Sequence, residues 1–359
     1  MPLGLRIERR MRRFLLFLVL ICVACSGSPA ETTTLPTVTT TAPTTTEAST
    51  TTEAITTTTE PLPTSPINGL PVEDIEALER RVVAVKIDNH PNARPQSGLD
   101  LAEAVIEVPV EGLTRFIALF HSTDAEYLGP VRSGRPSDGR LLNPLNATMA
   151  ISGGQDWVIS GLRAEVEGII GEVRPAMFRI DGRRAPHDLY TNTEALRQLA
   201  DERGYSNEPP TAWYVFDEMP RSAERASQVV MNFGNSFLVT WEYNPVARKY
   251  ARLHGGSPSE ALDPDGETYE ITADSLVVII ARRYTEQAPA GQTSVPAMDT
   301  VGTGTAYVFS QGGVLEGTWA RESSEAQLVL SDLNGDDMAV PPGYLWISIV
   351  PEQNGISFE

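Results

Sequence analysis

The chain has 359 residues and a formal net charge of −19, a balance that argues against nucleic acid or anionic lipid as partners of its folded part and favours neutral or cationic ones. Its only cysteines, Cys22 and Cys25, lie near the N-terminus. This position excludes a disulfide, a Cys-ligated metal and a thiol nucleophile in the rest of the chain.

The N-terminus has the pattern of a bacterial export signal. Several arginines precede an apolar run, Phe14 to Ala24, that is too short to span a bilayer, which takes roughly 20 residues. The run ends at Val-Ala-Cys and is similar to a lipobox, in which the first mature residue, here Cys25, is acylated; Cys22 stands where a lipobox usually has Leu. We therefore expect a signal peptide over residues 1–24 and an extracytoplasmic protein held by lipid at Cys25 on the outer face of the cell membrane. Cleavage without lipid and an uncleaved anchor are the alternatives.

Residues 25–66 are predicted to form a disordered tether. From Glu31 to Pro66 the sequence is nearly all Thr, Pro, Ala, Ser and Glu, without the apolar periodicity that a folded segment needs to bury a core. Such a segment would hold the following domain away from the membrane as a flexible coil. Without the signal peptide, which carries five Arg and one Glu, the mature chain has a net charge of about −23.

An N-terminal mixed α/β domain is expected over residues 67–218. Val82 to Ile87 is apolar and β-branched, which predicts a buried strand. Ala102 to Glu111 alternates between apolar and polar side chains and places Glu107 and Glu111 on one face of a second strand. The other elements expected here are strands over Thr114–His121 and Ala147–Ser152 and helices over Asp156–Glu165 and Thr191–Arg203.

A smaller, mostly β domain is expected over residues 219–359. Asn244-Pro245 separates two alternating segments, which predicts a hairpin, and Ser275 to Arg282 is a continuous apolar run typical of a central strand. The fold class predicted for the whole chain is therefore α+β. The expected strands of this domain are Ser236–Tyr243, Lys249–Leu253, Ser275–Arg282, Thr303–Ser310, Gly317–Arg321, Glu325–Leu330 and Tyr344–Val350.

Several segments resemble one bacterial family. In order along the chain they are IDNHPNARPQSGL, VEGLTRFIALF, GPVRSGRP and APHDLYTN, followed by the less specific GTGTAYVF, GTWAR and PPGYLWISIVP. They are similar to the YerB-like lipoproteins, a family whose function is unknown, although Asp188 stands where that family more often has Asn. The resemblance implies an exported, lipid-anchored protein with two domains, and it implies no activity.

Polar side chains of the first domain fall at strand ends and in loops bounded by Gly and Pro, where ligand sites are usually built. We predict that Arg115, Arg132 and Arg135 converge with Glu107 and His187. The arginines would either pair with carboxylates as a structural network or bind a carboxylate or phosphate of a ligand. The complete set of candidate binding residues is Asp88, Asn89, Arg94, Gln96, Glu107, Glu111, Thr114, Arg115, Arg132, Ser133, Arg135, His187 and Tyr190.

Local motifs for catalysis are weak. Ser133, His187 and Asp188 supply a nucleophile, a base and an orienting acid by type, but Ser133 lacks the G-x-S-x-G elbow, and adjacent His and Asp side chains rarely align as a triad. Glu107 and Glu111, four residues apart on a strand, would stand about 13 Å apart, beyond the separation of a glycosidase pair.

The sequence predicts no cofactor, no metal and no nucleotide. The four histidines show no ligand spacing, the calcium-loop pattern that begins at Asp332 fails at Asp337 and Gly343, and there is no P-loop or G-x-G-x-x-G. Two hypotheses remain. One is a non-catalytic envelope protein that binds a cell-wall component or a wall-synthesis protein. The other is a hydrolase or transferase acting on wall glycan or peptide.

Overall fold

The computed structural model describes residues 61–220 and 223–359. The expected signal peptide, the lipidation site at Cys25 and nearly all of the expected tether lie outside these residues. Within the described ranges, no helix is both long enough and apolar enough to cross a membrane.

Most strands of the described chain join one twelve-stranded mixed sheet. Across this sheet the main order is β21 (Val329–Asp332), β20 (Gly313–Arg321), β19 (Gly302–Ser310), β17 (Ser275–Glu286), β22 (Leu345–Pro351), β3 (Ala104–Pro109), β4 (Thr114–Phe120), β1 (Val83–Ile87), β5 (Thr148–Ala150) and β6 (Gly168–Ile170). Beside this path, β18 (Val295–Asp299) pairs with β17 and β9 (Glu224–Arg225) pairs with β20.

Three smaller sheets complete the β structure. The six-stranded sheet runs β13 (Ser257–Pro258), β12 (Lys249–His254), β11 (Leu238–Asn244), β10 (Gln228–Asn232) and β23 (Ile356–Phe358), with β16 (Thr272–Ala273) beside β12. The others are β15 (Thr268–Glu270), β14 (Glu260–Leu262) and β2 (Gln96–Ser97), and the pair β7 (Met177–Arg179) and β8 (Leu189–Thr191).

Three α-helices and three short 3-10 helices accompany the sheets in the described ranges. The α-helices are α1 (Pro136–Leu142), α2 (Asp156–Glu165) and α3 (Thr193–Glu202), and the 3-10 helices are η1 (Ile75–Leu78), η2 (Pro91–Ala93) and η3 (Asn143–Leu145). Pro136 at the first position of α1 loses no helical hydrogen bond there. Asn192 caps α3 because its Oδ1 accepts from the N–H of Ala195 at 2.7 Å.

The prediction of an α+β protein with a mixed α/β N-terminal domain is wrong. The described chain is mostly β, and the strands of its first half belong to a large mixed sheet that continues into the second half. The connection is β22, which pairs in parallel with both β3 and β17. Local patterns could not indicate this, because residues such as Ile106 and Ile347 that pair in the sheet lie far apart in the sequence.

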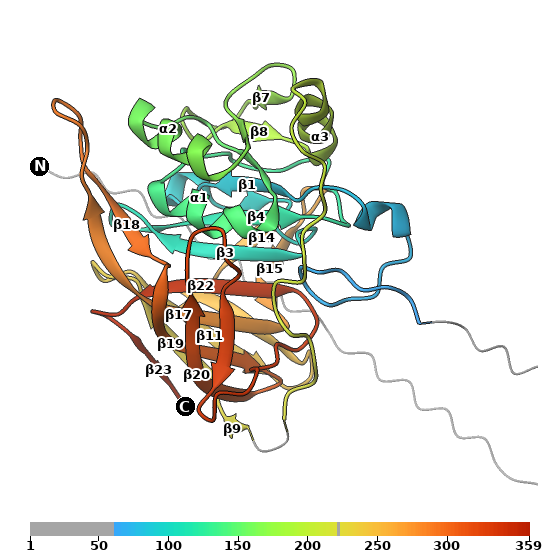
Figure 1. Cartoon of the computed structure of the whole chain (residues 1–359), viewed down its shortest axis with the longest axis vertical. Helices are drawn as coiled ribbons and strands as arrows, with labels where there is room; N and C mark the ends of the chain where they lie inside the picture. The colour runs from blue at the N-terminus through green and yellow to red at the C-terminus, as the bar shows by residue number, and fades with distance from the viewer. Residues whose placement is uncertain (1–60, 221–222) are drawn as a thin grey trace, which may run out of the picture. The chain divides into compact units, whose positions relative to one another are not determined.

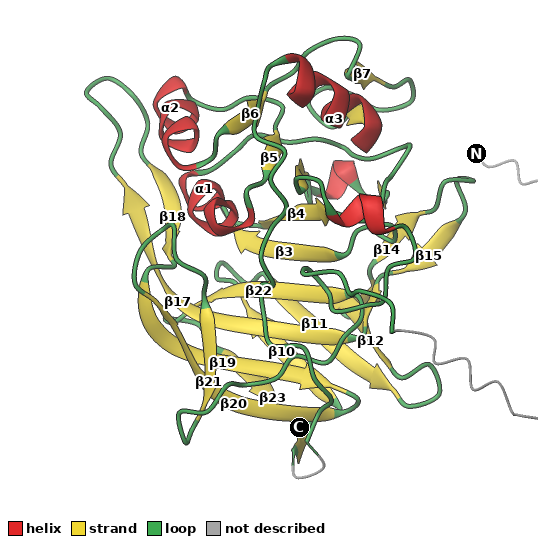
Figure 2. Ribbon diagram, turned by 45° about the vertical axis from the view of Figure 1, so that its right-hand side comes forward, coloured by secondary structure: helices red, strands yellow, loops and turns green. Residues whose placement is uncertain are grey.

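The large sheet is buried on both faces, since alternate residues of the same strands belong to two different cores. Ala84 and Ile106 face the core that contains α1 and α2. Val83 and Val105 face the core that contains α3 and the inner side of the six-stranded sheet, including Trp241. Figure 2 shows α1 and α2 near one end of the large sheet and β10, β11 and β12 beside β22. In accordance with this burial, every residue of β1, β3 and β4 is buried, including the polar Lys86 and Glu107.

Candidate functional site

The first group of predicted residues surrounds Asp88, directly after β1. Asp88 is buried, and its Oδ2 lies 2.8 Å from His187 Nδ1 and 3.2 Å from Arg132 Nε, the latter without the alignment of a hydrogen bond. His187 also stacks on His90, with ring centroids 4.7 Å apart. Asp88 therefore lies between Arg132 and His187 and contacts both.

A second group lies in the loop between β1 and β2. The Nε of Arg94 donates to Asn89 Oδ1 at 2.9 Å and its Nη2 donates to the Asn89 carbonyl at 2.9 Å. Gln96 Nε2 donates to Asn89 Oδ1 and to the Asp88 carbonyl. Both partners of Arg94 are neutral, and no ion pair joins Arg94 to a carboxylate among the described residues. The hydrogen bonds of Arg94 therefore go only to neutral acceptors, while the carboxylates of Glu107 and Asp88 act on its charge from further away.

Glu107 does not converge with the three arginines as predicted. It is fully buried in β3, where its carboxylate accepts hydrogen bonds from Thr114 Oγ1 at 2.6 Å, Arg252 Nη2 at 2.6 Å and Trp346 Nε1 at 2.9 Å. Asn89 Nδ2 donates in turn to Thr114 Oγ1. A buried carboxylate needs such a complete set of donors, so Glu107 and Arg252 form a structural pair that joins the two halves of the chain.

The remaining arginines form a third group beside α1. Arg135 makes two hydrogen bonds to the exposed carboxylate of Glu111, at 2.7 and 2.9 Å, and Arg115 donates from Nη1 to the Ser133 carbonyl at 2.9 Å. Burial, together with the charges of Arg135 and Arg132, lowers the pKa of Arg115 to about 10.

The prediction that Glu107 and Glu111 share a strand face is also wrong, because β3 ends at Pro109.

The last candidate, Tyr190, is a packing residue. It lies in β8, is buried, and stacks on Tyr127 with ring centroids 4.5 Å apart. A Cβ on Gly129 would collide with its ring, so the glycine makes room for this aromatic contact.

Ser133, His187 and Asp188, the candidates by residue type for a catalytic triad, each have other partners. Ser133 Oγ lies 3.5 Å from Ser152 Oγ, His187 pairs with Asp88, and Asp188 forms an ion pair with Arg179 at 2.5 Å. In residues 61–220 and 223–359, no group of three or more His, Cys, Asp or Glu side chains is placed to hold a metal ion.

A cleft of about 240 Å³ opens beside the second group. Its walls come from the loop after β1, from Phe116 of β4, and from the β12–β13 turn of the six-stranded sheet. Arg94 and Arg252 enter it together with His254, whose Nδ1 lies 3.0 Å from the Leu238 carbonyl. Burial and the charges of Arg94 and Arg252 lower the pKa of His254. The full lining is Asn89, Arg94, Pro95, Gln96, Phe116, Arg252, His254, Ser257, Pro258, Ser259, Glu260 and Ile271.

Sequence reasoning missed Arg252, His254 and Trp346 because each stands within a strand, β12 or β22, without a recognisable motif. Their relation to Glu107 depends on strand pairing across the two halves. One signal was present: Arg252 shares an inward face of β12 with Tyr250, between half-buried positions, and it is fully buried. In an acidic chain, an arginine at an inward position indicates a buried carboxylate partner.

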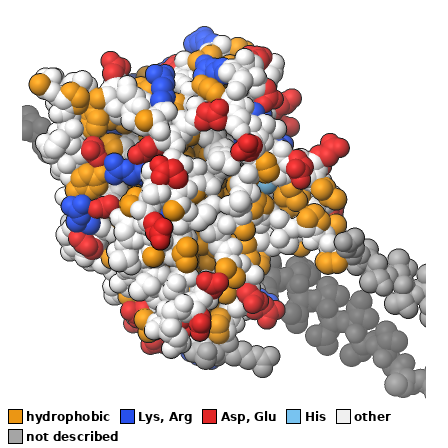
Figure 3. All heavy atoms as spheres, in the orientation of Figure 1, with side chains coloured by type: hydrophobic (Ala, Val, Ile, Leu, Met, Phe, Trp, Pro, Cys, Tyr) orange, Lys and Arg blue, Asp and Glu red, His pale blue; other side chains and the backbone are white. Residues whose placement is uncertain are grey.

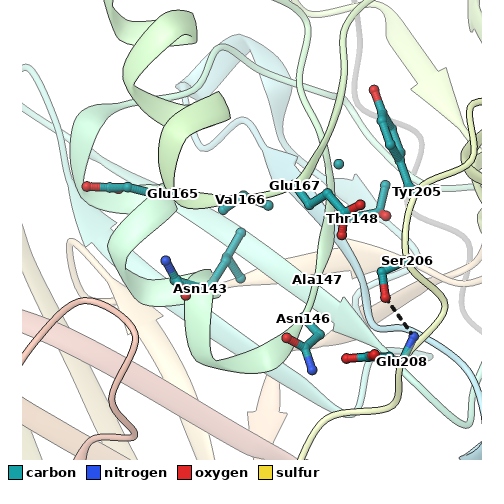
Figure 4. A pocket seen from close by; sticks show the side chains of 12 residues that line it. Asn143, Asn146, Ala147, Thr148, Glu165, Val166, Glu167, Tyr205, Ser206 and Glu208 are labelled. Carbon is teal, nitrogen blue, oxygen red and sulfur yellow. Dashed lines mark hydrogen bonds between the residues drawn. The ribbon is translucent and has the colours of Figure 1, made fainter.

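A different hollow, of about 170 Å³, lies between η3, β5, β6 and residues 205–208. Figure 4 shows Glu165 on the opposite side of it from Ser206 and Glu208. Its lining is acidic and amide-rich, with Asn143, Asn146, Glu167 and Glu208, and it contains none of the residues predicted from the sequence. The surface in Figure 3 is likewise scattered with acidic side chains, which agrees with the net charge of −19.

Comparisons with known proteins place the chain in a family. Residues 67–206 match the protein of unknown function (DUF3048) N-terminal domain, and residues 229–347 match the corresponding C-terminal domain. A protein of Bacillus subtilis (strain 168) named "Putative lipoprotein YerB" is 29% identical over 303 residues, which are 82% of this chain and 88% of that protein. The crystal structure of YerB from Bacillus subtilis matches with a TM-score of 0.71 and 28% identity, covering 82% of this chain and 99% of that one. The chain therefore belongs to the DUF3048 family, whose N-terminal and C-terminal domains it carries in order.

Proposed function

We propose that this chain is an extracytoplasmic protein, anchored by lipid at Cys25, that binds an anionic group of a cell-wall component in the cleft between Arg94 and His254. The name of the Bacillus relative supports the lipoprotein part of the proposal. The Val-Ala-Cys segment at the end of the N-terminal apolar run supports the anchoring residue.

The binding proposal rests on one observation: the two arginines in the cleft have different hydrogen-bond partners. Arg252 is neutralised by Glu107, to which it donates at 2.6 Å, and its guanidinium lies over the rings of Phe116 and Trp346. Arg94 has only the amide and carbonyl oxygens of Asn89 as partners. A guanidinium held by neutral acceptors inside a concave site has the geometry for a carboxylate or phosphate oxygen.

Titration calorimetry of the folded protein with three probes tests this proposal. The probes are a soluble wall peptide with free carboxylates, the same peptide with its carboxylates amidated, and glycerol phosphate. We expect the free peptide or glycerol phosphate to bind, and the amidated peptide to bind at least tenfold more weakly, because a charge-assisted hydrogen bond to Arg94 is lost. The two anionic probes separate a peptide carboxylate from a phosphate polymer as the natural source.

Substitution of Arg94 supplies the matched comparison. Arg94→Gln should weaken binding about tenfold or more, while it lowers the free energy of unfolding by about 1.5–3 kcal/mol, the value of a hydrogen bond in which one group is charged, and leaves the protein folded. Arg163→Gln is the control, because Arg163 is exposed on α2, which packs against the other face of the large sheet. Equal binding by the two variants, or no binding of either anion by the parent protein, would refute the proposal.

A further inference from the structure

The ends of β1 and β5 and the start of β4 meet at one edge of the large sheet. β1 and β5 are parallel and β4 is antiparallel to β1, so Asp88, Ser152 and Arg115 all stand at this edge. Residues 131–134 enter between the two strand ends and hydrogen-bond to both, with the N–H of Ser152 3.0 Å from the Arg132 carbonyl. Figures 1 and 2 both show α1, which follows this segment, beside the end of β3. In open α/β sheets, ligands bind outside such carboxyl ends of parallel strands.

Four cations gather at this edge, and one of them has no carboxylate of its own. The three ion pairs are Lys86–Asp138, Arg132–Asp88 and Arg135–Glu111, at 2.6, 3.2 and 2.7 Å. Arg115 is only 7% exposed and forms no ion pair within residues 61–220 and 223–359. Its Nη1 donates to the Ser133 carbonyl at 2.9 Å, and its buried Nε has no acceptor among the described residues. The four cations therefore exceed their carboxylate partners by one charge.

The surroundings of Arg115 make its charge costly. A buried guanidinium has lost hydration, and here no paired carboxylate replaces it. Burial is the largest cause of the lowered pKa of Arg115. Arg135 and Arg132 lower it further, and each acts more strongly than either of the carboxylates that raise it. An anion beside Arg115 and Arg132 would offset this repulsion.

Two hydroxyl groups stand beside the two guanidinium groups. Ser133 Oγ and Ser152 Oγ are 3.5 Å apart, the limit of a hydrogen bond, and neither has another partner in the described part of the chain. Arg132 and both serines are half-buried, and the position of a Cβ on Gly153 has no atom within 4 Å, so this edge borders open space. Guanidinium N–H groups of Arg115 and Arg132 and two hydroxyls supply more donors than the two oxygens of a carboxylate accept in one plane.

We propose that this edge binds a phosphate group between the guanidinium groups of Arg115 and Arg132. The hydroxyls of Ser133 and Ser152 donate to the same group. A phosphate monoester carries a charge of about −1.5 to −2 at pH 7 and three strong acceptor oxygens, which matches an unpaired guanidinium and two hydroxyls without other partners. None of these four residues lines the Arg94 cleft, so the proposal does not rest on binding there.

Titration of the Arg94→Gln protein, followed by calorimetry and by the melting temperature, tests this site apart from the cleft. The probes are inorganic phosphate, bis(glycerol) phosphate and acetate at matched ionic strength. Inorganic phosphate should bind and raise the melting temperature, because a ligand that binds only the folded state stabilises it. Acetate should bind at least about tenfold more weakly, because it lacks the third oxygen. The diester separates a phosphodiester from a terminal phosphate as the source: binding of either phosphate supports the site, and binding of neither overturns it.

Two further substitutions in the Arg94→Gln protein identify the residues that bind. Arg132→Gln should weaken phosphate binding about tenfold or more in a folded protein, because Asp88 keeps His187 as a partner. Arg115→Met should abolish the rise in melting temperature with phosphate. Without phosphate it should melt within a few degrees of its parent, because it removes an unpaired buried charge and keeps an apolar side chain. Arg163→Gln, an exposed position on α2, is the control and should bind phosphate unchanged.

Three results would overturn the proposal. One is full phosphate binding by Arg132→Gln and Arg115→Met, and another is an equal loss in Arg163→Gln. The third is phosphate binding by the natural sequence but not by Arg94→Gln, which would place the phosphate in the Arg94 cleft. Phosphate binding that survives Arg94→Gln and is lost in Arg132→Gln supports this site whatever the outcome for the cleft.

Discussion

At the scale of single residues, the nearest carboxylate decides whether an arginine is paired within the protein or could pair with a ligand. Arg252 and Arg94 enter the same cleft, but Glu107 neutralises the first and only Asn89 contacts the second. Burial lowers the pKa of Arg94, and the charge of Arg252 lowers it further. An anion that entered the cleft would reverse this effect, so Arg94 is more stable as a cation when the ligand is bound.

His254 makes the proposed binding dependent on pH. The Leu238 carbonyl can only accept, so His254 Nδ1 carries the proton and Nε2 is bare in the neutral ring. Because the pKa of His254 is lowered below 6.5, the ring is neutral at pH 7 and gains a charge only in more acidic solution. An anion favours the charged ring, so its affinity should rise about tenfold as the pH falls from about 7.5 to about 5.

The measurement is the pH profile of binding in the parent protein and in His254→Gln. The variant should bind with a nearly flat profile across the same range. Stability should change in the opposite sense, because the unfolded chain takes up a proton on His254 at a higher pH than the folded chain, so the parent loses stability as the pH falls below about 6.5. A flat profile in the parent, or an unchanged slope in the variant, would exclude His254 from the site.

At the scale of elements, two of the three α-helices of the described residues and one hairpin were predicted, whereas α1 was not. The helix predicted over Asp156–Glu165 has those bounds, and the predicted hairpin is confirmed by the pairing of Asn244 with Lys249. The strand predicted over Glu325–Leu330 is wrong in most of its length, since β21 begins at Val329. Hydrophobic periodicity indicates which segments are strands, but it carries no information on which strands pair.

The candidate site residues fall into separate groups for the same reason: local sequence patterns do not show which distant strands pair. Asp88, Asn89, Arg94 and Gln96 stand together after one strand, so local sequence was enough to group them. Two of the partners of Glu107, Arg252 and Trp346, come from β12 and β22, which only long-range pairing brings near β3. The sequence alone therefore identified one wall of the cleft and not the other.

The pairing of β20 with β21 depends on a glycine. A Cβ on Gly317 would lie 2.1 Å from the backbone oxygen of Ser331, which cannot move without shifting β21. Gly317→Ala should therefore destabilise the protein by about 1–3 kcal/mol, the typical cost of forcing atoms into a packed site. Chemical denaturation measures this loss.

A matched control separates steric collision from the general effect of replacing glycine. Gly171→Ala adds the same methyl group at a position with no atom within 4 Å and without a positive φ. It should leave the free energy of unfolding within about 0.5 kcal/mol of the parent or increase it. Similar losses in both variants would show that the contact with Ser331 is unimportant.

At the scale of the whole molecule, the two family domains share a sheet and a buried ion pair. β22, near the C-terminus, lies between β17 and β3, and the carboxylate of Glu107 in β3 is satisfied by Arg252 and Trp346 from the second half. Domains joined by flexible linkers usually unfold separately, whereas elements of one sheet lose their hydrogen bonds together. We therefore expect residues 61–359 to unfold in a single transition.

The fragment 61–218 is the direct test of this expectation. Without β22, the backbone of β3 from Ala104 to Glu107 has no partner on one side, and apolar side chains such as Val105 and Phe116 lose the core that the six-stranded sheet builds over them. An unpaired sheet edge promotes aggregation, and each large apolar side chain left exposed forfeits about 1.5–3 kcal/mol of burial, which is a large part of the stability of a typical domain. The fragment should therefore aggregate or show no cooperative thermal transition, whereas 61–359 should give coincident transitions by far-ultraviolet circular dichroism and tryptophan fluorescence. Trp157 and Trp213 report on the first half and Trp241, Trp319 and Trp346 on the second, so separate transitions would be visible. A soluble fragment 61–218 with its own sharp transition would show instead that the N-terminal family domain folds independently and that the shared sheet forms only after both halves are folded.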